Sequence, residues 1–299
     1  MDSLADENPF LKIRLWNLFL WLAVSAIPAV IIWYAVTHNI PSLAQSDGAR
    51  SVFEIIYATI AVLLWTSRQT KKHNLSVKKL FGTVSFRSSD VWRVLCFGVP
   101  LVLNKFGTTG LTIYLFYRFN FGFDLDKISD KILMASVDPY WIIIMGIICV
   151  GIIAPIIEEM LFRGLFISRA SQLWGTKWAL VVSSILFGLL HLDPVGATLF
   201  GLVMGLIYLQ TGRLILPVLF HVINNLAATH LFGVMADVFM DDVGSTKPTD
   251  GELSRMLIFA ATSLAISIPW LIFIVYRNWP KDWSIPYLRN SQSHVPTLQ

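Results

Sequence analysis

The sequence predicts an all-α protein, a polytopic transmembrane helix bundle of about eight spans. Hydrophobic residues make up 55% of its 299 residues, and only 14% are charged, against roughly 25% in an ordinary soluble domain. The apolar residues form separate segments, and the basic residues gather between them. This pattern is typical of a multi-pass membrane protein with one membrane domain over residues 1–299.

Eight apolar segments are candidates for membrane spans, because about 20 apolar residues cross the hydrocarbon core of a bilayer. They cover residues 15–36, 52–67, 91–117, 140–172, 178–191, 196–210, 214–232 and 253–276. The first is longer than the core of a signal peptide, so we expect it to be a retained span. The fifth and sixth are short, and only residues 192–195 separate them. The chain after Asn278 is expected to be irregular.

The charged loops predict the orientation of the bundle. Basic residues follow the second, fourth, sixth and eighth segments, whereas the connections after the third and seventh are acidic. Because loops rich in Lys and Arg stay on the cytoplasmic side, both termini are expected in the cytoplasm and the protein in the cell membrane. The net charge of +4 is small and spread over these loops, which argues against nucleic-acid binding.

Two adjacent carboxylates and an arginine lie within the fourth apolar segment, as Glu158, Glu159 and Arg163. An ionised group in such a segment is costly unless it is paired or functional. Glu159 and Arg163 are four residues apart, so a helix places them on one face as an ion pair. Glu158 lies about 100° around the helix and points elsewhere. Pro155 removes a backbone hydrogen bond just before these acids and predicts a kink.

Two further polar pairs have the same helical spacing. Phe187 precedes His191 by four residues, and His221 precedes Asn225 by four. Two imidazoles, a carboxamide and a carboxylate that converge from three helices can activate water in either of two ways. A glutamate is the general base while the other groups bind an oxyanion, or the histidines and a glutamate hold zinc. The structural alternative is a buried ion pair with packing histidines, and the combination of all three motifs weighs against it.

The order of these motifs resembles the CPBP family of intramembrane proteases, which includes the type II CAAX prenyl endopeptidases and the bacteriocin-processing Abi proteins. The motifs read Glu158-Glu159-Met160-Leu161-Phe162-Arg163, Phe187-Gly188-Leu189-Leu190-His191 and His221-Val222-Ile223-Asn224-Asn225, within residues 140–232. The resemblance implies a membrane endopeptidase with an all-helical core and an internal cavity.

The same resemblance assigns a role to each motif residue. Glu158 would activate water, with Glu159 and Arg163 in support. His191, His221 and Asn225 would bind the water and stabilise the oxyanion.

No cofactor is expected, with zinc held by His191, His221 and Glu158 as the alternative. We favour the metal-free mechanism because the histidines come singly from different helices, without the His-Glu-x-x-His spacing of common zinc proteases. The expected partners are a membrane-associated protein or peptide substrate, prenylated proteins among them, and the lipid bilayer. Nucleic acid is not expected, and the sequence does not indicate an oligomeric state.

Two other functions fit a helical membrane protein. The first is a non-proteolytic scaffold or regulator with the same fold, although a scaffold has no need for buried ionisable groups. The second is a proton-coupled transporter that uses the carboxylates as proton sites, which would show matching halves with broken helices. The sequence has no such symmetry. Lys105, in the third segment, either lines the site or marks a misplaced boundary and reaches the membrane surface.

Overall fold

The computed structural model describes the chain except for residues 1–8, 84–86, 120–138, 240–248, 282 and 293–299. The described part contains helices and no strand, which confirms the all-α prediction. In chain order the elements are η1 (Pro9–Lys12), α1 (Trp16–Asn39), α2 (Pro41–Ala44), α3 (Asp47–Lys72), α4 (Val77–Phe81), α5 (Ser88–Arg118), α7 (Tyr140–Ile148), η2 (Cys149–Ile153), α8 (Ala154–Glu159), η3 (Met160–Phe166), α9 (Ile167–Trp174), α10 (Thr176–Leu189), α11 (Pro194–Thr211), α12 (Ile215–Phe239), α13 (Asp250–Arg277) and α14 (Pro286–Gln292).

Each of the eight apolar segments is helical, but they differ in length. Among the described residues, six helices are long and apolar enough to cross a membrane. The other two are α10, with 14 residues, and the apolar part of α12 over Ile215–Ala227. At 1.5 Å per residue, α10 spans only about 21 Å, less than the ~30 Å of a hydrocarbon core. The polytopic bundle is therefore confirmed, with α10 shorter than a full crossing, whereas α12 extends over 25 residues to Phe239.

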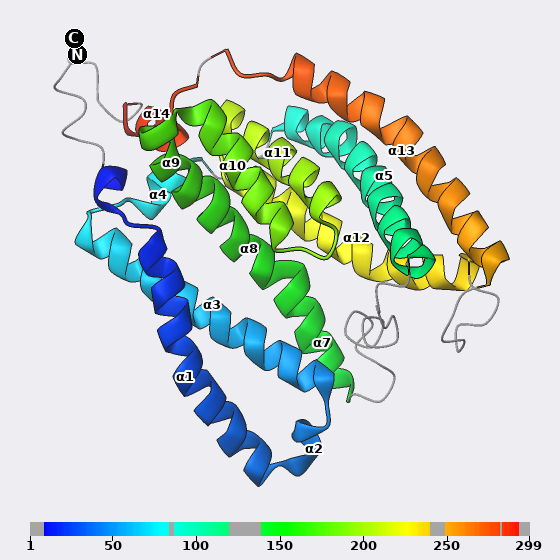
Figure 1. The fold of residues 1–299 in the computed structure, drawn as a ribbon. Helices are drawn as coiled ribbons and strands as arrows, with labels where there is room; N and C mark the ends of the chain where they lie inside the picture. Colours follow the sequence, from blue (N-terminus) through cyan, green and yellow to red (C-terminus); the bar gives the residue numbers. More distant parts are fainter. Residues whose placement is uncertain (1–8, 84–86, 120–138, 240–248, 282, 293–299) are drawn as a thin grey trace.

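The acidic motif lies in a long helix that changes its winding twice. From Tyr140 to Trp174 the helix is continuous, and it crosses the middle of the bundle in Figure 1. Two π-helical segments, η2 and η3, flank the six-residue α8 that carries both glutamates. Pro155 lies in the first turn of α8, directly after η2. The predicted irregularity before the acids is thus a π-helical segment, a feature that occurs frequently at functional sites.

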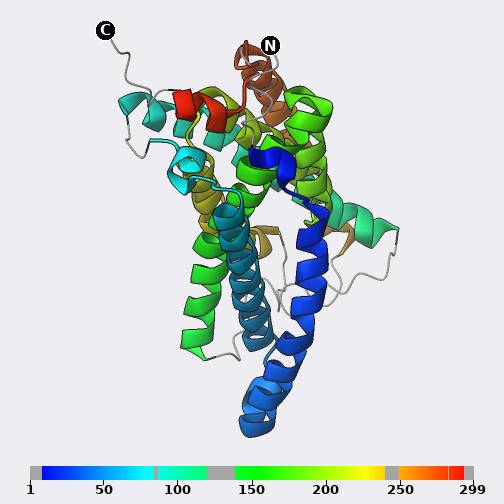
Figure 2. The same cartoon turned by 90° about the vertical axis from the view of Figure 1, so that its left-hand side faces the viewer.

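The helices form two groups around this long helix. α1 packs against α3, and α3 packs against the long helix, on the side that faces the viewer in Figure 2. On the other side α10 and α11 form a hairpin, and α5 pairs with α13 (Figure 1). Glycines allow the close approaches. A Cβ atom at Gly107 of α5 would lie 3.1 Å from the Ala260 carbonyl oxygen, and one at Gly201 of α11 would lie 3.2 Å from Ser184 Cα of α10.

The first and last described segments meet at one end of the bundle. The rings of Phe10 in η1 and Tyr287 in α14 pack edge to face, with their centroids 4.9 Å apart. The Tyr287 hydroxyl accepts a hydrogen bond of 3.0 Å from the Ser76 backbone N–H. The prediction of an irregular tail is therefore wrong for residues 286–292, because Pro286 starts a short helix and Tyr287 buries its ring. The acidic connections 120–138 and 240–248 lie outside the described residues, so the cytoplasmic orientation of both termini stays a prediction.

Candidate active site

The three motifs, which lie far apart in the sequence, meet in the structure. Glu158 and Glu159 come from α8, and Arg163 comes from η3 in the same helix. His191 lies two residues beyond the end of α10, and His221 lies on α12. Five of the six predicted site residues therefore gather from three parts of the chain.

Glu159 is the centre of a buried ionic network. Its Oε1 atom lies 3.0 Å from Arg163 Nη1 and 2.8 Å from His221 Nδ1. The side chains of Glu159 and Arg163 are 0% and 1% exposed. The guanidinium also donates a hydrogen bond of 3.3 Å from Nη2 to the Gly201 carbonyl. The predicted ion pair is present, and each buried charge has an opposite charge beside it, which a buried ion requires.

Glu158 faces the two imidazoles from the other side. Its Oε2 atom lies 3.7 Å from His221 Nε2 and 3.9 Å from His191 Nε2. Both separations exceed a direct hydrogen bond and suit three groups that share one water molecule. The Glu158 side chain is 31% exposed, in contrast to Glu159. The two adjacent glutamates therefore differ in environment, and Glu158 is the carboxylate that solvent and a substrate can reach.

Hydrogen bonds at the opposite ring nitrogens orient both histidines. His191 Nδ1 lies 2.7 Å from the Phe187 carbonyl oxygen. Because a carbonyl only accepts, this Nδ1 carries a proton. His221 Nδ1 lies 2.8 Å from the Glu159 carboxylate, which implies a proton there too. Each ring therefore directs Nε2 towards Glu158, where an unprotonated Nε2 can accept a hydrogen bond from water and a protonated Nε2 can donate one. A water molecule that donates to both groups, or a proton on Nε2 itself, avoids repulsion between an imidazole lone pair and the Glu158 carboxylate.

An aromatic wall encloses the polar groups. The Phe187 ring is 1% exposed, and its centroid lies 4.4 Å from the Arg163 guanidinium carbon and 4.4 Å from the His191 ring centroid. Phe200 of α11 packs edge to face on His221 at 4.9 Å. These rings fix the imidazoles and keep water from Arg163. Sequence reasoning included Phe187 only for its spacing and missed Phe200, because nothing in the sequence indicates which aromatic of α11 faces the site.

The short length of α10 explains the position of His191. A full span ending at this residue would carry it towards the far surface, whereas a helix of 14 residues ends near the level of Glu158. Asp193 then starts α11, where its Oδ1 accepts a hydrogen bond of 2.9 Å from the Gly196 N–H. Its Oδ2 accepts a second bond from Thr108 of α5. Asp193 and Pro194 thus begin α11, and these bonds anchor the tip of the α10–α11 hairpin.

Asn225 and Lys105 extend the site in different directions. Asn225 lies one turn after His221, and its Nδ2 donates a hydrogen bond of 3.0 Å to the Val150 carbonyl. Val150 belongs to η2, so this contact ties α12 to the π-helical segment. Lys105 lies near the middle of α5 and is half-buried, within electrostatic range of Glu158 and Asp193. It therefore lies beside the site, and the alternative of a misplaced helix boundary is wrong.

The histidines have the second contacts that metal ligands need. A ligating imidazole usually donates its other N–H to a carboxylate or carbonyl, as His191 and His221 do here. In the described part of the chain, however, no group of three or more His, Cys, Asp or Glu residues comes close enough together to hold a metal ion. Zinc binding by His191, His221 and Glu158 stays an alternative for experiment.

The residues of this buried site are arranged like the motifs of the CPBP-type membrane proteases, and comparison with known proteins supports the resemblance. Residues 140–227 match the family model described as type II CAAX prenyl endopeptidase Rce1-like. This range contains all six predicted site residues, so the resemblance inferred from the motifs is confirmed.

One relative extends the similarity beyond the core. The chain is 25% identical over 187 residues to the Bacillus subtilis (strain 168) protein named "Putative membrane peptidase YdiL". The aligned region covers 62% of this chain and 71% of the relative. No solved structure matches. The family model and this relative together support a membrane protease in general, in a multi-pass helical protein.

Proposed function

We propose that the chain is an intramembrane endopeptidase in which Glu158 activates a water molecule. The observation that carries the proposal is the position of Glu158 Oε2, 3.7 Å and 3.9 Å from the Nε2 atoms of two histidines. Glu158 is partly exposed while Glu159 is buried in an ion pair. A carboxylate free of an arginine can accept a proton, whereas a fully paired one serves to orient its neighbours.

The reaction follows from these positions. Glu158 takes a proton from water, and the resulting hydroxide forms a bond to the carbonyl carbon of the peptide. The negative charge that develops on the carbonyl oxygen is stabilised by hydrogen bonds from His191 and His221, each protonated at Nε2, and from the Asn225 amide. Glu158 then returns the proton to the leaving nitrogen as the C–N bond breaks. Arg163 and Glu159 hold His221 in place throughout.

The substrate is a membrane-associated protein or peptide, with prenylated proteins as one class within it. A site among membrane-spanning helices is accessible to a segment that is itself held in or at the bilayer. The basic loops support cytoplasmic termini and a site entered from that side. The cell membrane is the proposed location.

The test compares purified wild type with Glu158→Gln for cleavage of a library of membrane peptides in lipid. Losing a general base should reduce turnover by about 10²- to 10⁴-fold. Glu54→Gln is the matched control, because Glu54 is an exposed glutamate paired with Arg50 on α3. It should cut like wild type. Thermal stability of all three proteins shows whether a loss reflects chemistry or unfolding.

The outcomes separate the alternatives. Equal cleavage by wild type and Glu158→Gln would reject Glu158 as the base. Loss of wild-type cleavage in chelator, restored by zinc, would favour the metal mechanism over the glutamate mechanism. If no peptide is cut while a partner protein co-purifies with both forms, the scaffold function replaces the protease.

A further inference from the structure

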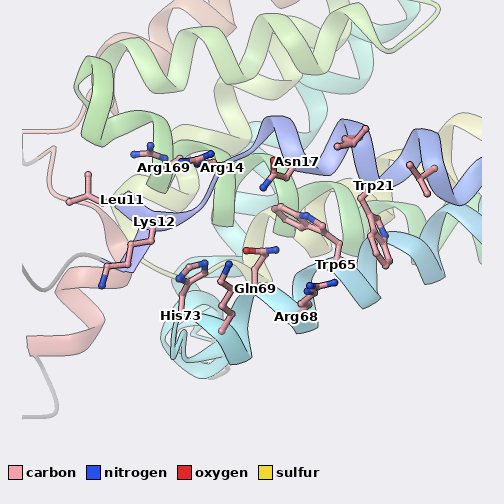
Figure 3. Close-up of a pocket in the computed structure, with 13 residues that line it drawn as sticks. Leu11, Lys12, Arg14, Asn17, Trp21, Trp65, Arg68, Gln69, His73 and Arg169 are labelled. Carbon is pink, nitrogen blue, oxygen red and sulfur yellow. The ribbon is translucent and has the colours of Figure 1, made fainter.

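A pocket of about 900 Å³ lies apart from the active site, where the N-terminal segment meets the end of α3. Figure 3 shows Arg14 and Arg169 on one side of it and Arg68 and His73 on the other. Its lining comes from η1 and the first three turns of α1, from the end of α3, and from α9. No motif of the proposed protease belongs to it.

The pocket is strongly basic. Five of its thirteen lining residues are Lys or Arg, and no Asp or Glu is among the described residues that line it; the five are Lys12, Arg14, Arg68, Lys72 and Arg169. The Arg169 Nε atom donates a hydrogen bond of 2.7 Å to the Ile13 carbonyl. Its Nη1 atom is buried without a hydrogen-bond partner in the structure. A guanidinium held in this way has donors left for an anion.

Burial and neighbouring lysines lower the pKa of a histidine in the pocket. The pKa of His73 lies below its ordinary value of 6.5, first because the ring is partly buried and then because Lys72 and Lys12 are near. The cations therefore act together at the point where an anion would bind. An anionic ligand would relieve their mutual repulsion.

The other half of the pocket is apolar. Leu20, Trp21 and Val24 of α1 face Trp65 of α3 across it. The Trp21 Nε1–H donates a hydrogen bond of 2.8 Å to the Ala61 carbonyl, which joins the two helices on this side. The lining changes from charged to apolar where α1 begins and α3 ends. Both helices are long enough to cross a membrane, so their adjacent ends lie at headgroup level.

We propose that this pocket binds an anionic phospholipid. The phosphate would contact Arg14, Arg68 and Arg169, since guanidinium groups match phosphate geometry. The acyl chains would lie along Trp21 and Val24, between α1 and α3. Basic pockets between membrane helices bind lipid phosphates in this way. A soluble anion would use the cations alone, whereas a lipid explains both halves of the lining.

A lipid in this pocket would connect the outer helices to the catalytic helix. Arg169 belongs to the same continuous helix as Glu158 and Arg163. The inference does not depend on the proposed protease activity, because it rests on other residues. Its test therefore measures binding and not cleavage.

The experiment measures lipid binding to the full chain in detergent by native mass spectrometry, with phosphatidylglycerol and phosphatidylcholine titrated separately. Wild type should bind phosphatidylglycerol more tightly. Arg68→Gln/Lys72→Gln should weaken that binding about 25-fold, at roughly fivefold for each basic residue. Lys71→Gln/Lys78→Gln is the matched control, because it removes two cations from the same end of the bundle that do not line the pocket. It should bind like wild type.

Fluorescence locates the lipid. Brominated phosphatidylglycerol should quench tryptophan emission more than brominated phosphatidylcholine does, and Trp21→Phe/Trp65→Phe should remove most of the difference, because both tryptophans line the pocket. Equal affinity for the two lipids, or equal weakening by both double variants, would overturn the proposal. So would full competition by inorganic phosphate at matched concentration, which would make the pocket a site for soluble anions.

The acidic residues of the N-terminus need their own control. Asp2, Asp6 and Glu7 lie outside the described residues. The titration is therefore repeated with Asp2→Asn/Asp6→Asn/Glu7→Gln. A preference for phosphatidylglycerol that appears only in this variant would assign the pocket to the chain's own N-terminus and overturn the proposal.

Discussion

Glu159 and His221 are joined by a contact of 2.8 Å between the carboxylate Oε1 and the imidazole Nδ1, although they come from different helices. The same oxygen lies 3.0 Å from Arg163 Nη1. One carboxylate therefore both balances a buried arginine and fixes the tautomer of a histidine. The orientation of His221 towards Glu158 depends on a residue that has no direct part in the proposed chemistry.

Removing the charge of Glu159 should destabilise the protein. In Glu159→Gln, Arg163 keeps its positive charge with 1% exposure and no ionised partner. Leaving one partner of a buried pair alone costs about 3–5 kcal/mol. Thermal or denaturant unfolding in detergent should show the loss. Glu158→Gln should change stability much less, because the Glu158 side chain is 31% exposed and its carboxylate has no arginine partner in the described structure.

A double variant distinguishes charge from packing. Glu159→Gln/Arg163→Met removes both charges and should recover much of the stability lost in Glu159→Gln. It should stay inactive, because His221 has lost the carboxylate that orients it. A Glu159→Gln protein as stable as wild type would show that the ionic network contributes little to the fold.

The sequence was sufficient to predict contacts within single helices. Glu159 and Arg163 are four residues apart, and this spacing alone places their side chains together. The same spacing places the side chains of Phe187 and His191 together, and their ring centroids lie 4.4 Å apart. The apolar segments likewise predicted the all-α bundle, since hydropathy reports directly on burial in a bilayer.

Contacts between helices were not predictable from one sequence. Nothing in α11 shows that Phe200 reaches His221, because the residues of that helix are apolar on all sides. Pro155 predicted an irregularity before α8 but not its π-helical winding, and the π-helical segment after α8 has no sequence signal. The predicted segment 178–191 has the same length as α10 but lies two residues too late, so it placed His191 inside the helix rather than beyond its end at Leu189. These features depend on how helices pack, which a single chain's pattern does not encode.

The pKa of His73 should report on the positive charge of the basic pocket. Its pKa is expected below 6.5, with burial as the larger cause and Lys72 and Lys12 as the smaller ones. Because the folded-state pKa is lowered, the stabilising contribution of the neutral ring is present above 6.5 and is lost as the pH falls through the folded-state pKa. NMR of labelled histidines, assigned with His73→Gln, measures the value.

Two changes should then move the His73 pKa upward. Lys72→Gln removes one repulsive charge and should raise the pKa without restoring 6.5, since the effect of burial remains. Bound phosphatidylglycerol should also raise it, because an anion favours the imidazolium. A His73 pKa at or above 6.5 in lipid-free protein would contradict the positive field assigned to the pocket.

Gly188 should tolerate no side chain, because the α10–α11 hairpin closes against it. A Cβ atom there would lie 2.5 Å from the Pro194 backbone oxygen and in closer conflict with the Thr198 side chain. Gly188→Ala should therefore push α11 from α10 and displace His191, three residues later. We expect a stability loss of about 1–3 kcal/mol and a loss of cleavage. Gly98→Ala is the matched control, since a Cβ there meets nothing within 4 Å and alanine favours the helix by about 1 kcal/mol. If both variants have the stability and the cleavage activity of wild type, the hairpin does not set the position of His191.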